Sequence, residues 1–279
     1  MRSRDGVGYI VVALVVAPVV AGGLYSAAAS LGLVGAGATG FSVARFTAVL
    51  TDPSTWRSVM WTLCTAGTAT MIATVAAMLV SVRVQRSRAG QWLATSSLAV
   101  PHIAASLAAL MLLGQSGLLS RLAYAAGLTS QPAEFPALVY DRHGVALIVA
   151  CAWKEFPFLV LTAVAVLATH NTQLDEVART HGANARAVMR RITIPLLWRG
   201  IAPAVIAAFA YLIGQYEMAV VLAPSDPLPL SVLTYERAVD GNLAHRGEAH
   251  VLGFLALLLT GALVLWHERS RRVAERTLS

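Results

Sequence analysis

The chain has 279 residues, of which 57% are hydrophobic and only 13% are charged, and its mean hydropathy is +0.67. A soluble domain cannot bury that much apolar surface, so the composition indicates an all-α polytopic membrane protein. The formal net charge is +7. Because the basic residues flank apolar segments, this charge indicates orientation in a membrane and argues against a nucleic-acid partner.

The chain contains a single lysine, Lys154. A P-loop needs a lysine directly after a glycine-rich turn, and Lys154 stands in an apolar stretch instead. We therefore expect that the chain has no ATPase site and binds no cofactor of its own. No metal site is expected either. His102 has no second ligand at metal-binding spacing, which favours a hydrogen-bonded core residue.

Six apolar segments are each about long enough to cross a bilayer, which takes roughly twenty residues. They are Val7–Ala29, Trp56–Val82, Trp92–Leu113, Gly144–Ala168, Ile201–Leu222 and His250–Trp266. Arg2 and Arg4 before the first segment also fit a cleaved secretory signal, but the length of the run favours an anchor helix. Leu118, Leu119, Leu122 and Ala126 share one helical face, which predicts a short interfacial helix in the segment between the third and fourth spans.

The distribution of arginine predicts the orientation. Fourteen of the twenty arginines lie on the side of a six-span arrangement that carries both termini, and six lie on the other side. Positive charge favours the cytoplasmic side of a membrane. Both termini, and the charged segment between the fourth and fifth spans, are therefore expected in the cytoplasm.

That charged segment, Asp175–Pro195, predicts a bent two-helix hairpin. Leu174–His181 contains no glycine or proline and is typical of a short helix, which Gly182 ends because glycine tolerates left-handed dihedrals. Asn184 is a suitable cap for a second helix, and we expect Pro195 to close the unit.

The hairpin resembles the coupling loop of the type I, MetI-like permeases of binding-protein-dependent ABC importers. The family pattern is Glu-Ala-Ala, three residues, Gly, nine residues, then Ile-any-Leu-Pro. The matching positions are Glu176, Val177, Ala178, Gly182, Ile192, Ile194 and Pro195. Valine replaces alanine at 177 and isoleucine replaces leucine at 194. The resemblance extends over residues 56–268 of what we expect to be a single permease domain spanning 1–279.

The resemblance implies that the hairpin, residues 174–195, docks into a separate ATPase subunit that uses ATP. The residues implied in this contact are Glu176, Ala178, Gly182, Ala183, Ile192 and Pro195. It further implies a second permease, identical or different, and an extracytoplasmic substrate-binding protein. The expected location is the bacterial inner membrane, in contact with lipid.

Ionisable groups at bilayer depth cost roughly 3 kcal/mol each, so they need a partner or a function. The candidates for a translocation path are Lys154, Glu155, Gln215, Tyr216 and Glu217. The stretch that begins at Gly214 is similar to permeases of the polyamine, thiamine and ferric-ion group. A competing interpretation is an ion pair between Lys154 and a glutamate that joins spans four and five.

A different function class also fits these acidic residues. Glu155 and Glu217 could carry protons in a secondary transporter, but such folds usually contain internal repeats or broken helices, and the sequence shows no repeat. An intramembrane enzyme would need a nucleophile and a base at matched spacing, and none is evident. The leading hypothesis is therefore the permease subunit of an ATP-driven importer.

Overall fold

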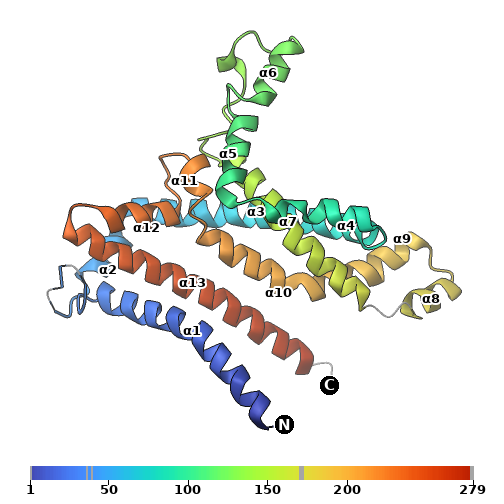
Figure 1. Cartoon of the computed structure of the whole chain (residues 1–279), viewed down its shortest axis with the longest axis horizontal. Helices are drawn as coiled ribbons and strands as arrows, with labels where there is room; N and C mark the ends of the chain where they lie inside the picture. The colour runs from blue at the N-terminus through green and yellow to red at the C-terminus, as the bar shows by residue number, and fades with distance from the viewer. Residues whose placement is uncertain (1, 36, 39, 170–172, 277–279) are drawn as a thin grey trace. The chain divides into compact units, whose positions relative to one another are not determined.

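The computed structural model describes residues 2–35, 37–38, 40–169 and 173–276, and the secondary structure within these ranges is helical throughout (Figure 1). Six of the helical segments described there are long and apolar enough to cross a membrane. The sequence-based expectation of an all-α protein with six spans is therefore confirmed.

The helices follow the chain in this order. The long helices are α1 (Arg2–Ser30), α3 (Pro53–Gln85), α7 (Val145–Ala168), α10 (Ile194–Ile213) and α13 (Leu243–Arg276). The shorter α-helices are α2 (Ala44–Thr51), α4 (Arg88–Thr95), α5 (His102–Leu113), α6 (Leu118–Ala125), α8 (Gln173–Thr180), α9 (Ala185–Val188), α11 (Ala219–Leu222) and α12 (Leu230–Val239). Two 3₁₀ turns, η1 (Ser96–Ala99) and η2 (Pro132–Glu134), and one π-helical turn, η3 (Met189–Thr193), complete the set.

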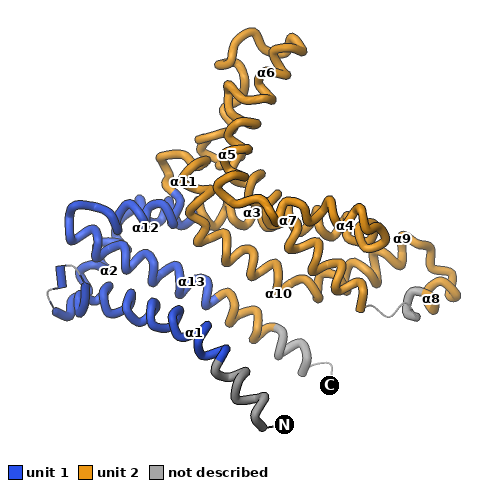
Figure 2. Tube along the Cα trace, viewed as in Figure 1, with its two compact units in different colours: residues 1–60, 229–262 blue, residues 61–228, 263–279 orange. Residues whose placement is uncertain are grey.

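The chain divides into two compact units (Figure 2). Unit 1 comprises residues 1–60 and 229–262, and unit 2 comprises residues 61–228 and 263–279. The hairpin and the polar residues of the fourth and fifth spans all belong to unit 2. The expectation of a single domain over the whole chain stays a prediction.

Small side chains form the buried face of α3. Ala66, Ala69, Ala73 and Ala77 are at most 5% exposed, and their spacing of three or four residues places them on one side of the helix. Buried threonines on the same face donate their hydroxyl groups back to the helix, as Thr74 does to the carbonyl of Thr70. Small residues allow helices to approach closely in a membrane, where apolar side chains gain little from leaving lipid.

The C-terminal half of α7 and the N-terminal half of α10, which the sequence predicts to be nearer the cytoplasm, also pack closely. Ala163 and Leu167 of α7 form a buried cluster with Leu197 and Ile201 of α10. A β-carbon at Gly200 would lie 2.6 Å from the methyl groups of Val166, so glycine is required at this approach. The hairpin at residues 174–195 thus lies between two tightly packed helices, α7 before it and α10 after it (Figure 1).

The third span is not one helix over Trp92–Leu113, as the sequence analysis expected. It is broken between α4 and α5 by η1 and by an extended Val100. Pro101 explains the break, because proline lacks an amide hydrogen and restricts the preceding residue to extended dihedrals.

The fifth span also differs from the expected Ile201–Leu222. Helix α10 ends at Ile213, and residues 214–218 are not helical before α11 begins. The side-chain oxygen of Gln215 accepts a hydrogen bond from the amide of Glu217 at 3.0 Å. This local bond offers the backbone an alternative to the helix, which accounts for the break.

Unit 1 is held by charged groups near the junction of α2 and α3. Asp52 accepts hydrogen bonds from the amide and the hydroxyl of Ser54, and Arg237 of α12 lies 3.3 Å from Asp52 and 2.7 Å from Glu248. The hydrogen bonds from Ser54, together with Arg237, hold the pKa of Asp52 below its usual value. The Asp52 carboxylate therefore caps α3 and ties its start to α12.

Candidate functional site

The first helix of the hairpin ends in a Schellman motif. The amide of Gly182 donates to the carbonyl of Arg179 at 2.9 Å, and the amide of Ala183 donates to the carbonyl of Ala178 at 3.0 Å. Gly182 has φ of +82°, which is the left-handed conformation this motif requires. A β-carbon on Gly182 would meet no atom within 4 Å, so the need for glycine comes from the backbone alone.

The second helix of the hairpin begins as predicted but does not end at Pro195. The side chain of Asn184 accepts the amide of Ala187 at 2.8 Å and caps α9. Helix α9 then continues through the π-helical η3 into α10, with Pro195 in the first turn of α10. Proline is tolerated in this continuous helix because the wider π-helical turn of η3 directly precedes it and changes the hydrogen-bonding register there.

The residues that the resemblance implies in the ATPase contact are exposed or half-buried in the described chain. Glu176, Gly182 and Pro195 are exposed, whereas Ala178, Ala183 and Ile192 are half-buried. Val177 is 55% exposed, which is unusual for an apolar residue beside charged neighbours. Among the hairpin residues whose exposure is described, the Glu176 carboxylate and a small apolar surface are thus accessible.

Lys154 lies near the middle of α7 and is 6% exposed. Its Nζ atom donates to the carbonyl oxygens of Ser97, at 2.9 Å, and Val100, at 2.7 Å. Both carbonyls lie at the break in the third span, where they are accessible to Lys154. Among the described residues no carboxylate forms an ion pair with Lys154, so the geometry does not contain the proposed pair between spans four and five.

Glu155 lines a cavity of about 450 Å³ between the η1 turn, α5, α7 and α10. The other lining residues are Leu98, His102, Lys154, Phe158, Ala207, Ala208 and Tyr211. The hydroxyl of Tyr211 lies 3.2 Å from Nε2 of His102, and their rings are 5.7 Å apart. His102 is thus a hydrogen-bonded residue, and within the described ranges no group of three potential ligands surrounds a metal position.

The remaining path candidates occupy the break after α10. Gln215 is buried, Tyr216 is half-buried and Glu217 is exposed. Glu217 is close enough to act electrostatically on His102 and Tyr211. The structure therefore places Glu217 within electrostatic reach of two residues that line the same cavity as Glu155, although Glu217 lies in the non-helical break after α10 and Glu155 lies in α7.

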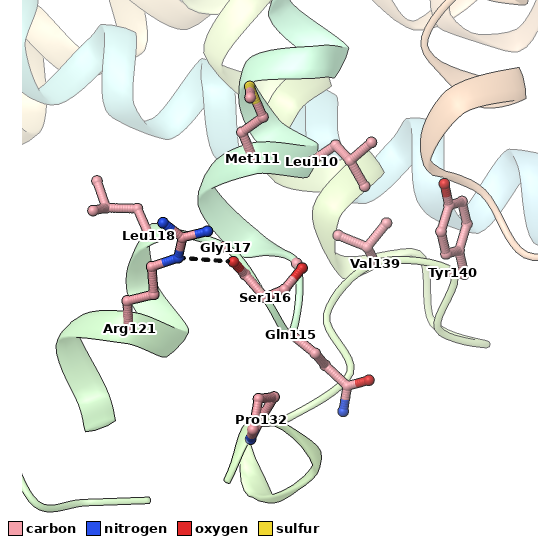
Figure 3. A pocket seen from close by; sticks show the side chains of 11 residues that line it. Leu110, Met111, Gln115, Ser116, Gly117, Leu118, Arg121, Pro132, Val139 and Tyr140 are labelled. Atoms are coloured by element: carbon pink, nitrogen blue, oxygen red, sulfur yellow. Dashed lines mark hydrogen bonds between the residues drawn. The ribbon is translucent and has the colours of Figure 1, made fainter. Parts of the chain in front are cut away.

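A second cavity, of about 660 Å³, lies where α5 turns into α6 (Figure 3). The Nε atom of Arg121 donates to the carbonyl of Ser116 at 3.2 Å, and Gln115 donates to the carbonyl of Phe135 at 2.9 Å. A β-carbon at Gly117 would lie 2.6 Å from the carbonyl of Met111, so the turn needs glycine. This cavity belongs to the segment that the sequence places outside the membrane.

A sequence model of the family described as the binding-protein-dependent transport system inner membrane component matches residues 69–269. The chain belongs to this family. It is a multi-pass inner-membrane permease component of a binding-protein-dependent ABC importer.

Curated relatives of the permease include permeases for molybdenum. The molybdenum transport system permease protein ModB of Mycobacterium tuberculosis is 26% identical over 231 residues, which cover 79% of this chain and 81% of ModB. The inner membrane ABC transporter permease protein YnjC of Escherichia coli is 26% identical over 234 residues, covering 80% of this chain and 43% of YnjC. A probable molybdenum ABC transporter permease of Haloferax volcanii is 32% identical over 126 residues, covering 45% and 42% of the two chains.

Solved structures share the permease fold. A bacterial ABC transporter that imports the acidic polysaccharide alginate superposes with a TM-score of 0.71 at 16% identity, covering 98% of this chain and 99% of that chain. The alginate transporter in complex with an alginate pentasaccharide-bound periplasmic protein gives a TM-score of 0.72 at 18% identity, covering 97% and 96%.

Sequence reasoning missed the carbonyl partners of Lys154 and most of the cavity wall of the permease. Phe158 follows Glu155 by three residues, and Ala207 precedes Tyr211 by four. Helical spacing therefore contained a signal for these two positions. Leu98 carried no such signal, because it lies on a separate, broken span.

Proposed function

We propose that this permease couples ATP hydrolysis by a separate subunit to solute movement through the docking of residues 174–195. The observation that carries the proposal is the hairpin itself. Helix α8 is ended by hydrogen bonds to the carbonyls of Ala178 and Arg179 and by a left-handed Gly182, and α9 is capped by Asn184. Because the hydrogen bonds at these helix ends make the hairpin rigid, it can move as one body when a bound partner moves.

The docking contact would be made by the exposed Glu176, with Val177 and the half-buried Ala178, Ala183 and Ile192 supplying apolar area. Gly182 and Pro195 would shape the surface. A carboxylate at the edge of an apolar patch suits a partner cleft with a basic rim, because complementary charge gives specificity and orientation.

The ATP would be used entirely by the partner. The single lysine of the permease is buried and donates to two carbonyls, so it is not placed to hold phosphates. We accordingly propose a transport subunit that has no catalytic site and binds no cofactor or metal.

Two further partners are proposed: a second permease, identical or related, and an extracytoplasmic substrate-binding protein. The alginate transporter was solved with a periplasmic protein, which supports the second partner by analogy. The outer segment around Arg121 and Tyr140, which contains a cavity, would be the surface that the substrate-binding protein contacts (Figure 3). If two ATPase subunits act as a pair, they offer two clefts, and each permease supplies one hairpin. This favours two permease chains in the complex.

The orientation is proposed from the arginine distribution, with both termini and the hairpin in the cytoplasm. The exposed apolar side chains of α1 would contact lipid. Membership of the polyamine, thiamine and ferric-ion group remains a proposal that rests on the stretch 214–217, since the relatives named above include permeases for molybdenum. The alternative of a proton-coupled transporter is disfavoured by the family.

The experiment is recovery of the ATPase subunit with affinity-tagged permease from detergent extract. Glu176→Lys reverses the charge at the docking surface and should lower recovery by about tenfold or more, since each 1.4 kcal/mol is a factor of ten and like charges at an interface cost several kcal/mol. Glu236→Lys, the same change on the exposed surface of α12, is the matched control. Equal recovery with both variants, at equal membrane abundance, would contradict the proposal.

A further inference from the structure

Three arginines lie close together in the chain where α3 turns into α4. Arg83 is in the last turn of α3, Arg86 is in the connection and Arg88 begins α4, and all three side chains are exposed. The sequence contains no acidic residue between Asp52 and Glu134. Among the described residues no carboxylate forms an ion pair with any of the three arginines. Their positive charge is therefore uncompensated within the part of the chain that the structure describes.

The connection between α3 and α4 is held by side-chain hydrogen bonds. The hydroxyl oxygen of Ser87 accepts the amide of Gly90 at 3.1 Å and caps α4. The Nε2 atom of Gln91 donates to the carbonyl of Gln85 at 3.2 Å. The start of α4 therefore lies against the end of α3 (Figure 1), and the three arginines are kept together on this turn.

An apolar surface adjoins these charges on α4. Trp92 is 79% exposed and Leu93 is 77% exposed. Trp92 follows Arg88 by four residues, so the two side chains share one face of the helix. Tryptophan is enriched at membrane–water interfaces, and an arginine at this depth extends its charge toward the lipid phosphates. A negatively charged headgroup with acyl chains attached matches both parts of this surface.

We propose that Arg83, Arg86, Arg88 and Trp92 form a binding site for an anionic phospholipid. The guanidinium groups hold the phosphate, whose oxygens they can bind in pairs, and the ring of Trp92 contacts the upper part of the acyl chains. The site adjoins the end of the candidate membrane span Pro53–Gln85, where lipid headgroups are at hand. The inference is independent of the proposed ATPase docking and of the identity of the solute.

Other partners match this surface less well. A zwitterionic phospholipid offers a phosphate but no net charge, whereas each basic residue near an anionic membrane surface strengthens binding about fivefold. An acidic surface of a partner protein would match the arginines but not the exposed rings and methyl groups of Trp92 and Leu93. The site should therefore select an anionic lipid over a zwitterionic one.

The test is quenching of Trp92 fluorescence by brominated phospholipids. Full-length permease would be reconstituted in vesicles of phosphatidylcholine and phosphatidylglycerol, in which either one lipid or the other carries the bromine atoms. Because the chain contains six tryptophans, the signal of Trp92 is the difference between the parent and Trp92→Phe. We expect the association constant at Trp92 to be about fivefold or more higher for phosphatidylglycerol than for phosphatidylcholine, since even one arginine contributes this factor.

Arg86→Gln combined with Arg88→Gln should bring the two association constants close together. Arg199→Gln combined with Arg269→Gln is the matched control, because it removes the same charge from exposed positions on the same predicted side of the membrane and should keep the preference. Equal quenching by the two brominated lipids in the parent, or an equal loss of preference in both double variants, would overturn the inference. If Trp92 showed no preference and the Arg86/Arg88 variant instead recovered less ATPase, the arginines would belong to a protein contact.

Discussion

The Nζ atom of Lys154 lies 2.7 Å from the carbonyl oxygen of Val100, the residue directly before Pro101. Proline at 101 interrupts the third span and, in the described chain, leaves the carbonyl group of Val100 without a backbone partner, whereas that of Ser97 accepts the amide of Val100. In the bilayer core no water replaces such partners, and an unsatisfied group costs several kcal/mol. Lys154 is therefore best understood as the group that makes the break in this span tolerable.

Replacing Lys154 with methionine should destabilise the permease by about 2 to 3 kcal/mol, since hydrogen bonds to charged groups each contribute roughly 1.5 to 3 kcal/mol. The measurement is thermal unfolding in detergent. Lys154→Gln keeps a neutral donor and should lose less. A methionine variant as stable as the parent would show that the cost of burying the ammonium cancels its hydrogen bonds.

Replacing Glu217 with glutamine should reduce solute uptake while leaving membrane abundance near normal. Glu217 is exposed, and Lys154 is bound to carbonyls instead of to this carboxylate. If Glu217 did hold Lys154, the change would strand a buried cation at a cost of roughly 3 to 5 kcal/mol. Scarce protein that recovers when Lys154→Met is added would reject the pore role.

Replacing Gly182 with valine should weaken ATPase recovery and transport, because a β-branched residue at φ of +82° is strained. The expected cost is about 1 to 3 kcal/mol. Gly182→Asn should be milder, since asparagine tolerates left-handed dihedrals. Gly241→Val is the control, at a glycine with ordinary φ and equally open space. If Gly182→Val recovered the ATPase and transported solute as well as the parent, the proposed coupling role of the hairpin would be contradicted.

Replacing Asp52 with alanine should lower stability by about 1 kcal/mol at neutral pH, because the cap on α3 is lost. The folded-state pKa of Asp52 is lowered. Its contribution is therefore complete above about pH 4 and is lost as the pH falls through the folded-state value.

The difference in melting temperature between Asp52→Ala and the parent should accordingly shrink in acid. Asp52→Asn keeps an oxygen that can cap the helix and should cost less at neutral pH. If the difference in melting temperature between the parent and Asp52→Ala stayed the same in acid, the charge of the Asp52 carboxylate would not contribute to stability.

Local signals in the sequence predicted the elements that depend on local physics. The fourth span, expected at Gly144–Ala168, is α7 at Val145–Ala168, and a short helix is present as expected near Leu118, as α6, although its interfacial position stays a prediction because a candidate membrane span extends over His102–Ala125. Gly182 and Asn184 end and begin helices as expected. Each of these follows from hydropathy, or from a capping rule that acts within four residues.

The sequence did not predict contacts between distant parts of the chain. Asp52 and Arg237 are 185 residues apart, and no periodicity relates them. Lys154 was expected to need a partner, but its acceptors are backbone carbonyls that become available only because the third span is broken. Pro101 was visible in the sequence, yet hydropathy ran unbroken across it and concealed the break.

The π-helical turn η3 fixes the rotational setting of the hairpin on α10. A π turn contains one more residue than an α turn, and one residue corresponds to about 100° of helix rotation. Deleting any residue of Met189–Thr193 would let the turn relax to α geometry and swing α8 and α9 about the axis of α10. The number of residues between Gly182 and Pro195 therefore determines which side of the hairpin would face the ATPase in the proposed docking, and chimeric permeases that exchange this segment should preserve its length even where its residues change.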